Sequence, residues 1–393
     1  MKKIAVVGAG ITGLTAAYYL ARAGHSVTVL DAERHPAMKC SYANGGQISV
    51  SNSEVWTTWS NVLKGVKWML KKDAPLLIRP ELDWDKAVWL AKFLYHTAKN
   101  DYERNTAETI RLGIESRKLY QDIIQEEKID FNHSACGILH IYKDKKYFDA
   151  AKRVQELYQS NGCEWNILSP NEVYNLEKNL LYVDNLVGGV YTKDDSVGDI
   201  HKFCTGLEQV LKKKYKVWFQ YDYKVDTILD IHNYDSFDAI VLSNGVGVKS
   251  LSKQLGEKLP VYPVKGYSIT IEAIDIKNFD MMPKVSLLDD QEKIVSSLLG
   301  SRLRIAGTAE LTGENYDILY DRIRPLLNWC HKNFPELDTS SYSSWACLRP
   351  MTPNMMPIVR QSNSYQNIYY HTGHGHLGWT LSPATAKQLV KLI

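Results

Sequence analysis

The stretch that decides the fold stands at the N-terminus: residues 4–13 read IAVVGAGITG, and Ser26–Leu30 reads SVTVL before Asp31. The first apolar run predicts a β-strand, the glycines predict a tight turn, and the residues up to Ala23 predict a helix that ends at Gly24. A second strand follows and ends at a carboxylate. A strand, a G-x-G-x-x-G turn, a helix and a strand ending in an acidic residue are the signature of a dinucleotide-binding βαβ unit.

Each residue of this motif has a physical role. Gly8 makes the tight turn, Gly10 lets a pyrophosphate approach the backbone, and Gly13 lets the helix lie close to the sheet. The free N–H groups at the start of the helix bind phosphate oxygens. Asp31 accepts hydrogen bonds from the ribose hydroxyls, and it argues against NADP because it would repel a 2′-phosphate. The motif by itself leaves NAD and FAD open.

Length and composition exclude several classes of protein. A chain of 393 residues suggests two or three domains. A net charge of +3 is too weak to make nucleic acid the main partner. The six cysteines include no C-x-x-C pair and no metal-site spacing, which indicates a reducing compartment. The sequence contains no apolar run of about 18 residues, so it predicts no membrane span.

The order of the patterns predicts two interleaved domains. Residues 238–242 predict a buried strand, and the turn at 243–247 is either a second phosphate loop or, as we favour, a tight turn beside the first. Residues 262–310 alternate as in an antiparallel sheet. We predict an α/β protein, α+β overall, in which a Rossmann-like domain is interleaved with an antiparallel-sheet substrate domain. The predicted boundaries are 1–80, 146–250 and 340–393 for the cofactor-binding domain, and 81–145 and 251–339 for the substrate domain.

A basic amphipathic helix is predicted within residues 59–72. Its apolar stripe consists of Trp59, Val62, Leu63, Val66, Met69 and Leu70, and four lysines lie mainly off that stripe. The stripe either packs on the core of the protein or, with its tryptophans, contacts a lipid surface.

The C-terminal segment predicts a strand at 368–370, a glycine-rich loop at 373–379 and a final helix. Ser382 fits the N-cap of that helix and Pro383 its first position. This arrangement points the partially positive N-terminus of the helix toward the glycine loop. Such a position suits an electron-rich ring of a bound ligand that gains negative charge on reduction. His374 and His376 could ligate a metal, but the sequence shows no third ligand, so we expect a structural role and no metal.

Four further stretches carry a resemblance to a known family. The chain resembles the FAD-dependent D-amino acid dehydrogenases of small-subunit type, within the D-amino-acid oxidase/glycine oxidase superfamily of glutathione-reductase-type flavoproteins. The stretches are CSYANGGQIS at 40–49, PVYPVKGYS at 260–268, LRPMTP at 348–353 and GHGHLGW at 373–379.

The resemblance implies oxidation of the Cα–N bond of a D-amino acid or small amino acid by hydride transfer to FAD. Water then releases a 2-oxo acid and ammonia, and the electrons pass to a quinone-type acceptor. The implied location is cytoplasmic, either free or peripheral at the inner face of the cytoplasmic membrane, with residues 59–72 as the contact. The alternatives are an oxygen-dependent amine oxidase of glycine or sarcosine type, an amino-acid or amine-oxidising flavoenzyme of a biosynthetic or opine pathway, and a flavin-binding protein without catalysis.

The resemblance also implies roles for individual residues. Arg349 would bind the substrate carboxylate, as a guanidinium does bidentately, and Tyr267 is either a second carboxylate contact or one more tyrosine of the sheet. His374 is the third candidate at the reacting centre. The residues expected to bind FAD are Gly8, Gly10, Gly13, Asp31, Ala32, Ser41, Asn44, Gly46, Gln47, Ile48, Val225, Gly245, Cys347, Gly373, Gly375, His376, Leu377 and Gly378.

Cys347 departs from the family pattern, in which we expect glycine before Leu-Arg-Pro. In the related sarcosine oxidases, a cysteine in this segment carries the flavin covalently. We favour non-covalent FAD, with a thioether at Cys347 as the alternative and a small buried thiol as the ordinary interpretation.

Overall fold

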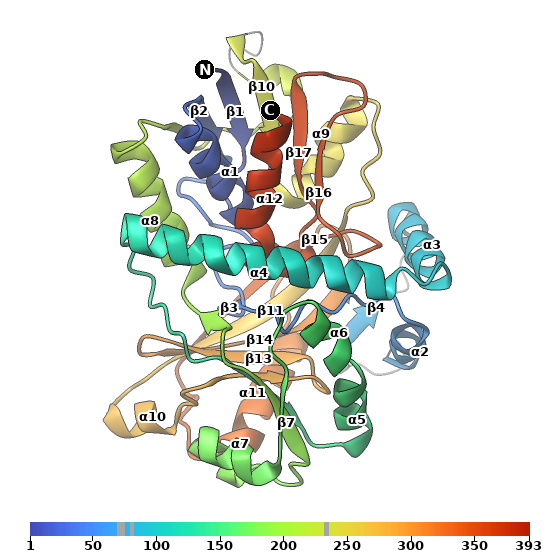
Figure 1. Ribbon diagram of the computed structural model, residues 1–393, viewed down its shortest axis with the longest axis vertical. Helices are drawn as coiled ribbons and strands as arrows, with labels where there is room; N and C mark the ends of the chain where they lie inside the picture. Colours follow the sequence, from blue (N-terminus) through green and yellow to red (C-terminus); the bar gives the residue numbers. More distant parts are fainter. Residues whose placement is uncertain (69–74, 79–81, 232–235) are drawn as a thin grey trace.

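The computed structural model describes residues 1–68, 75–78, 82–231 and 236–393. Two large sheets dominate these residues, and the long helix α4 (Tyr102–Glu127) runs across the junction between them (Figure 1). This mixed architecture confirms the predicted fold class, a Rossmann-like parallel sheet with a largely antiparallel second sheet.

Within the described residues, six strands form the first sheet in the order β16-β17-β10-β1-β2-β9. Their pairings are parallel except for that of β16 with β17. The strands are β1 (Lys3–Val7), β2 (Ser26–Leu30), β9 (Trp218–Gln220), β10 (Ala239–Leu242), β16 (Ile358–Gln361) and β17 (Ile368–Thr372). The sheet thus combines segments from the start, middle and end of the chain.

The helices beside this first sheet pack closely through small residues. Ala16 and Ala17 of α1 are fully buried, which lets α1 approach its neighbours α8 and α12 closely. Gly24 ends α1 with a φ of +87°, a conformation that glycine adopts readily. The helices of this half are α1 (Ile11–Arg22), α8 (Ile200–Lys213), α9 (Val248–Gln254) and α12 (Gly378–Leu392).

The final helix begins earlier than the sequence predicts. α12 starts at Gly378, so Ser382 is not its N-cap and Pro383 lies inside the helix. A proline in that position cannot donate to the carbonyl oxygen of Trp379 four residues before it. The hydroxyl of Tyr120 in α4 donates to that oxygen instead, at 2.6 Å. The tertiary contact thus satisfies the group that proline leaves unpaired, and the helix continues through the proline.

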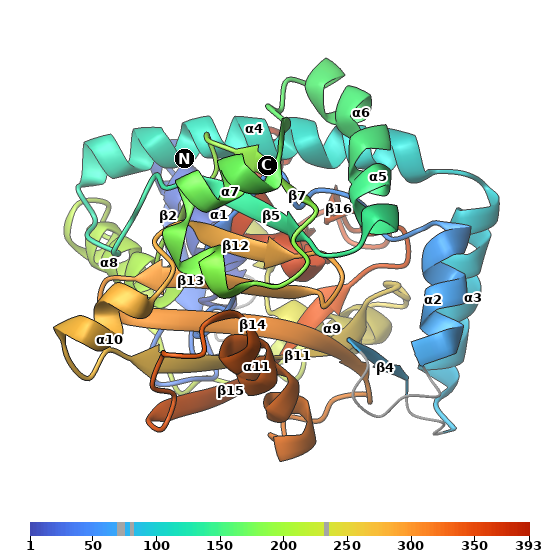
Figure 2. The ribbon, with the colours of Figure 1, turned by 90° about the horizontal axis from the view of Figure 1, so that it is seen from below.

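The second sheet has nine strands within the described residues, in the order β15-β11-β14-β13-β12-β5-β7-β6, with β4 paired to β14. α11 (Tyr320–Asn333) covers one face and shares an apolar core with it, and Figure 2 shows this helix below β14 and β11. The strands are β4 (Leu76–Ile78), β5 (Ile138–Tyr142), β6 (Asn166–Leu168), β7 (Gly188–Thr192), β11 (Tyr262–Glu272), β12 (Ser286–Asp289), β13 (Ile294–Leu299), β14 (Arg302–Leu311) and β15 (Tyr342–Met351).

The predicted domain boundaries cut across this second sheet. β6 and β7 fall within the predicted cofactor segment 146–250, and β15 falls within 340–393, yet all three strands pair in the second sheet. Strand type and length do not reveal which sheet a strand joins, because that depends on partners far away in the sequence. We therefore propose that these segments belong to the substrate domain, and the rest of the predicted division also stays a proposal.

Shorter elements surround the two sheets. They are β3 (Gln47–Ile48), paired with β8 (Ser196–Val197), and the helices α2 (Trp59–Trp68), α3 (Trp84–Ala98), α5 (Lys145–Arg153), α6 (Gln155–Ser160), α7 (Pro170–Leu176) and α10 (Ile276–Met281). α2 and α3 lie side by side at one edge of the molecule (Figures 1 and 2).

The apolar stripe of α2 is largely uncovered. Trp59, Leu63 and Val66 expose 57%, 63% and 58% of their surface. The rest of the predicted stretch, residues 69–72, lies outside the described residues. Among the helices that the structure describes, none has the length and apolar character needed to span a bilayer.

Candidate active site

A cavity of about 1010 Å³ lies between the two sheets and extends from the turn after β1 to α2, α3 and α5. Its size is that of a pocket for a large organic ligand. Of the predicted site residues, those that line it are Gly8, Gly10, Asp31, Ala32, Ser41, Asn44, Gln47, Val225, Gly245, Tyr267, Cys347, Arg349, His374, Gly375, His376 and Gly378. Gly13, Gly46, Ile48, Gly373 and Leu377 are not among its lining residues.

The glycine turn at the first end of the cavity is shaped by backbone packing. A Cβ at Gly13 would stand 1.8 Å from the carbonyl oxygen of Gly8, and one at Gly8 would stand 2.7 Å from that of Ser243. The turn at 243–247 therefore packs against the first turn, as we favoured. At Gly10, by contrast, the nearest atom is Ser41 Oγ at 3.5 Å, which leaves the backbone open to the cavity. This opening fits the close approach of a pyrophosphate.

Asp31 stands at the end of β2 beside this turn. Its two carboxylate oxygens accept from the backbone N–H groups of Ala9, at 2.5 Å, and Glu33, at 2.8 Å. Burial raises the pKa of Asp31, and the two backbone hydrogen bonds oppose that shift. The carboxylate is thus fixed at the cavity wall with lone pairs left for ribose hydroxyls.

The loop at 40–47 joins the nucleotide end to the second sheet. Ser41 Oγ accepts from Ile11 N at 3.0 Å at the start of α1. The second sheet holds the other end of the loop, because Arg304 donates to Asn44 O at 3.1 Å and the Gln47 amide donates to Ser286 Oγ at 2.9 Å. The loop is therefore placed by both sheets.

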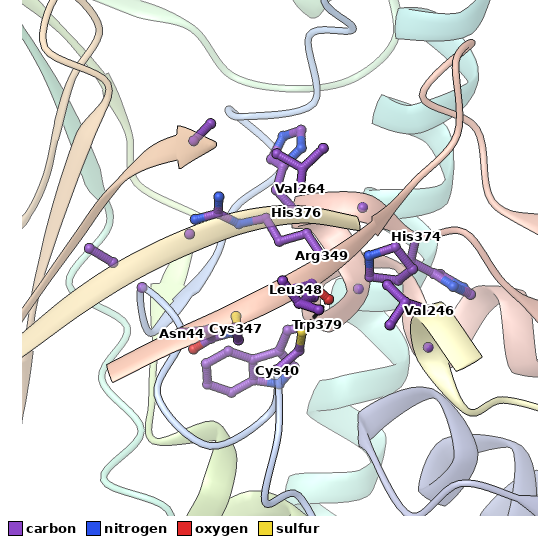
Figure 3. Close-up of a pocket in the computed structure, with 18 of the residues that line it drawn as sticks. Cys40, Asn44, Val246, Val264, Cys347, Leu348, Arg349, His374, His376 and Trp379 are labelled. Carbon is purple, nitrogen blue, oxygen red and sulfur yellow. Dashed lines mark hydrogen bonds between the residues drawn. The ribbon is translucent and has the colours of Figure 1, made fainter. Parts of the chain in front are cut away.

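Arg349 projects from β15 into the cavity, where Figure 3 shows it near His376 and Val264. The guanidinium lies over the backbone of Gly266, where an added Cβ would come within 2.2 Å of its central carbon. Nη1 donates to Thr308 O at 3.2 Å. Among the described residues, no carboxylate forms an ion pair with Arg349, so its charge and remaining N–H donors are available to an anionic ligand.

Tyr267 borders the cavity, but its side chain points to the other face of the sheet from Arg349. The register of β11 on β15 sets Tyr267 opposite Ala346 and Val264 opposite Arg349, and alternate residues of a strand point to opposite faces. Tyr267 belongs to the apolar core under α11, and its hydroxyl donates to the buried Glu310 at 2.7 Å. This placement does not support the expected contact with a substrate carboxylate.

The C-terminal glycine loop brings two histidines to the cavity. His374 is buried and its Nε2 pairs with Thr385 Oγ1 at 2.9 Å, while burial and the neighbouring His371 lower its pKa. His376 stacks on Trp56 with ring centroids 5.0 Å apart. Burial, followed by the charge of Arg349, lowers the pKa of His376 to about 3. Both rings are therefore neutral at pH 7.

Cys347 lies beside Cys40, a residue of the 40–49 motif for which the sequence predicts no role (Figure 3). Cys40 donates to Leu348 O at 2.7 Å. The neighbouring Cys40 thiol lowers the pKa of the Cys347 thiol, burial opposes this, and the charge of Arg349 favours it.

The far end of the cavity holds residues that sequence reasoning missed. They come from separate segments and share a polar or charged side chain: Glu54, Lys64, His140, Tyr142, Asp290 and Lys293. His140 and Tyr142 share β5, and Asp290 and Lys293 share the turn after β12, but the four segments lie far apart in the sequence and offer no common motif. The pairing of β12 with β5 brings two of these segments together.

Comparisons with known proteins give the family. The family described as FAD dependent oxidoreductase matches residues 3–392. D-amino acid dehydrogenase 3 of Mesorhizobium japonicum is 45% identical over 100% of this chain and 97% of its own length. The D-amino acid dehydrogenase of Dechloromonas aromatica is 36% identical over 100% of this chain and 96% of its own length.

Solved structures share the fold. Glycine oxidase from Geobacillus kaustophilus matches with a TM-score of 0.77 at 17% identity, over 100% of this chain and 95% of that one. L-proline dehydrogenase from P. horikoshii matches with a TM-score of 0.74 at 16% identity, over 100% of this chain and 92% of that one. The open glycine turn, the fixed carboxylate of Asp31 and the cavity between the sheets fit an FAD. The chain therefore belongs to the FAD dependent oxidoreductase family, together with these D-amino acid dehydrogenases.

Proposed function

We propose that this chain is an FAD-dependent D-amino acid dehydrogenase, which converts a D-amino acid to the 2-oxo acid and ammonia and passes the electrons to a quinone-type acceptor. The observation that carries the proposal is Arg349, a guanidinium without a carboxylate partner among the described residues, aimed into the cavity beside the loops expected to hold the flavin. The relatives that share the whole length of the chain support the same activity.

FAD supplies the acceptor for the hydride that leaves Cα. The glycine turn at 8–13 and Asp31 would hold its adenosine diphosphate, and the loops at 40–47 and 373–378 would border its ring. Arg349 binds the substrate carboxylate and so fixes which Cα–H bond faces the ring. The neutral His376, stacked on Trp56, forms a wall of the cavity and limits the access of water. The substrate reacts with its amine neutral, so the step needs no side-chain base.

The experiment that tests the function is anaerobic mixing of the FAD-loaded protein with single D-amino acids, glycine, sarcosine and D-proline. We expect at least one D-amino acid to bleach the flavin absorbance band. If none of the compounds does so, the amino-acid function is excluded. Aerobic turnover then identifies the acceptor: a dehydrogenase reduces a quinone analogue and forms little hydrogen peroxide, whereas stoichiometric peroxide identifies an oxidase of glycine or sarcosine type.

We infer that FAD is held without a covalent bond, with a thioether at Cys347 as the alternative. Cys347 lines the cavity and Cys40 lowers the pKa of its thiol, which are conditions that a thioether would need. Intact mass spectrometry of the denatured protein decides between the two. A mass equal to that of the bare polypeptide supports non-covalent FAD, and an added FAD mass that disappears in Cys347→Ser identifies the thioether.

We further infer a cytoplasmic protein that docks on the inner face of the membrane through α2 and α3. The six free cysteines fit a reducing compartment. Trp59, Leu63 and Val66 of α2 are exposed, as are Leu82 and Trp84 at the start of α3. Tryptophan beside lysine on an amphipathic helix is typical of interfacial binding, and the contact would bring the cavity close to a membrane quinone.

Co-sedimentation with anionic phospholipid vesicles tests this contact. We expect the protein to sediment with the vesicles and the triple variant Trp59→Ser, Leu63→Ser and Val66→Ser to stay in the supernatant. The matched control changes Leu181, Trp218 and Leu229 to serine, because these are equally exposed but lie on other elements. Wild-type protein that remains in the supernatant would exclude the contact.

A further inference from the structure

The loop at 40–47, here called the flavin loop, rests on the second sheet. The carbonyl oxygens of residues 43–45 each accept a hydrogen bond from a buried side chain, and each of these side chains comes from a different strand. The bonds are Ser268 Oγ to Ala43 O at 2.7 Å from β11, Arg304 Nη1 to Asn44 O at 3.1 Å from β14, and Ser297 Oγ to Gly45 O at 2.8 Å from β13. Three strands thus fix the orientation of three consecutive peptide groups.

Two glycines allow the flavin loop to approach the sheet closely. A Cβ at Gly45 would stand 2.5 Å from the side chain of Val295 on β13, and one at Gly46 would stand 3.1 Å from that of Ser297. Gly46 also has a φ of +76°, a conformation that glycine adopts readily. The backbone of the flavin loop therefore lies directly on the sheet.

The orientation of the carbonyl groups also sets that of the N–H groups. All described peptide bonds are trans, so the N–H of each residue points away from the carbonyl oxygen of the residue before it. The N–H groups of Asn44 and Gly45 therefore point away from the second sheet, and both residues line the cavity. Among the described residues neither N–H has an acceptor, whereas the N–H of Gly46 donates to Asn44 Oδ1 at 2.9 Å. Two adjacent donors are thus left for a ligand.

Arg304 brings a buried positive charge to these donors. The residue is 5% accessible and does not line the cavity, and within the described ranges no carboxylate forms an ion pair with it. The carboxylate of Asp199, whose charge acts on Arg304, is bound by Arg302 at 2.5 Å. Burial lowers the pKa of Arg304 to about 10, so the guanidinium is charged at neutral pH. A buried charge without an ion pair is costly, so its place behind the flavin loop indicates a functional role.

The bond to Asn44 O connects this charge to the cavity. A guanidinium that donates to a carbonyl oxygen polarises the peptide group, so the N–H on the other side of that group becomes a stronger donor. That N–H belongs to Gly45. A second bond of the guanidinium, from Nε to Thr270 Oγ1 at 2.7 Å, holds the side chain in this orientation. The charge of Arg304 therefore acts at the cavity although its side chain lies behind the loop.

We propose that Arg304 is a positioning residue that directs a strengthened N–H donor at the flavin, through the peptide group between Asn44 and Gly45, and so favours the reduced flavin. A hydride brings two electrons and one proton, so it leaves the ring with one negative charge more than before. Preorganised donors and a cation behind them stabilise such a charge. The inference rests on the proposed placement of the flavin ring beside this loop and not on the identity of the amino acid.

A reduction potential measured without any amino acid tests the proposal. The FAD-loaded protein is reduced anaerobically beside a reference dye, and the two absorbances give the equilibrium constant for two-electron reduction. Arg304→Gln keeps an amide donor but has no charge, and we expect it to lower this constant roughly 10-fold, a shift of about 30 mV to lower potential. Arg304→Lys keeps the charge and should stay close to wild type. Equal potentials in the two variants would overturn the inference.

FAD affinity separates this electrostatic role from a structural one. The loss of a loop contact alone should weaken FAD binding, so we expect Ser297→Ala to raise the Kd for FAD while its potential stays close to wild type. Arg111→Gln removes a charge that pairs with Glu108 on α4, and it should change neither quantity. A potential that falls as far in Ser297→Ala or Arg111→Gln as in Arg304→Gln would overturn the inference.

Hydrogen exchange of the wild-type protein tests the donors and requires no variant to fold. We expect FAD to slow the exchange of the N–H groups of Asn44 and Gly45, which have no acceptor among the described residues, and to change that of Gly46 less. Exchange at Asn44 and Gly45 that is the same with and without FAD would overturn the inference. The proposed function fails in a different experiment, in which no D-amino acid bleaches the flavin band, and neither the potential nor the exchange depends on that result.

Discussion

The two ends of the cavity are built in opposite ways. The nucleotide end is built around one continuous stretch, residues 4–31, in which Gly13 lies against the carbonyl oxygen of Gly8 and Gly10 stays open to the cavity. The substrate end comes from β5, β11, β13, β15 and the segment before α2, whose residues meet only after the second sheet has formed. The difference teaches that a change at the first end should remove the cofactor, and a change at the second should remove the substrate while the cofactor stays.

The largest expected effect is at the nucleotide end. Gly13→Ala places a Cβ 1.8 Å from Gly8 O, a contact that only a displaced turn relieves. We expect the purified variant to retain essentially no FAD, measured as the flavin-to-protein absorbance ratio. Gly65→Ala is the control, because its added carbon comes no closer than 3.8 Å to Leu76, and it should keep FAD. If the Gly13→Ala protein keeps its full FAD content, FAD binding does not depend on the geometry of this turn.

At the substrate end, Arg349→Ala should keep FAD and lose substrate. Truncation of one partner of a buried charge pair costs about 2–5 kcal/mol, roughly 30- to 5,000-fold in kcat/KM. Anaerobic flavin reduction over a range of substrate concentrations measures this loss. Arg111→Ala, which changes an exposed arginine of α4 paired with Glu108, should behave as wild type. An unchanged apparent affinity in Arg349→Ala would remove the arginine from the site.

This contrast also explains how far the sequence could lead. The glycine turn, Asp31, the loop at 40–47 and Arg349 were all predicted and line the cavity, because each belongs to a short contiguous motif. For Tyr267 the sequence left two roles open, a second contact to the carboxylate or one more tyrosine of the sheet, because a motif does not show to which face a side chain points until the strand register is known. The charged residues at the far end of the cavity had no local signal, since Glu54, Lys64, His140 and the turn at 290–293 lie on four separate segments.

The start of α12 shows the same limit. Ser382 and Pro383 carry a local helix-start signal, yet the helix begins five residues earlier, at Gly378. The Tyr120 hydroxyl, which lies more than 250 residues away in the sequence, satisfies the Trp379 carbonyl oxygen that the proline leaves unpaired. Tertiary packing therefore overrides a local signal that has no information about α4.

An intermediate effect is expected at Gly266, the residue that positions Arg349. In Gly266→Ala, the new Cβ would stand 2.2 Å from the guanidinium carbon and so displace the side chain. We expect kcat/KM to fall roughly 10- to 100-fold, since a misplacement of about 1 Å has that cost, while FAD content stays unchanged. The double variant with Arg349→Ala distinguishes the cause. If Gly266 acts through Arg349, Gly266→Ala has no further effect in that background. A fully additive loss would indicate a separate role for Gly266.

The smallest effect is expected at the contact between α4 and α12. Tyr120→Phe removes the hydroxyl that donates to Trp379 O at 2.6 Å and leaves that buried acceptor with the longer bond from Ser382 Oγ at 3.4 Å, a loss of about 1–3 kcal/mol. We expect the Tm to fall by several degrees, with FAD content and kcat/KM little changed, because neither cavity end loses a contact. Pro383→Ala supplies a backbone N–H that can donate to the same oxygen. It should therefore recover most of the loss in the Tyr120→Phe background and add little stability to the wild type. Tyr320→Phe, at an exposed tyrosine, controls for the loss of a hydroxyl alone. If Pro383→Ala stabilises both backgrounds equally, the proline and the tyrosine act independently and the Trp379 carbonyl is not their link.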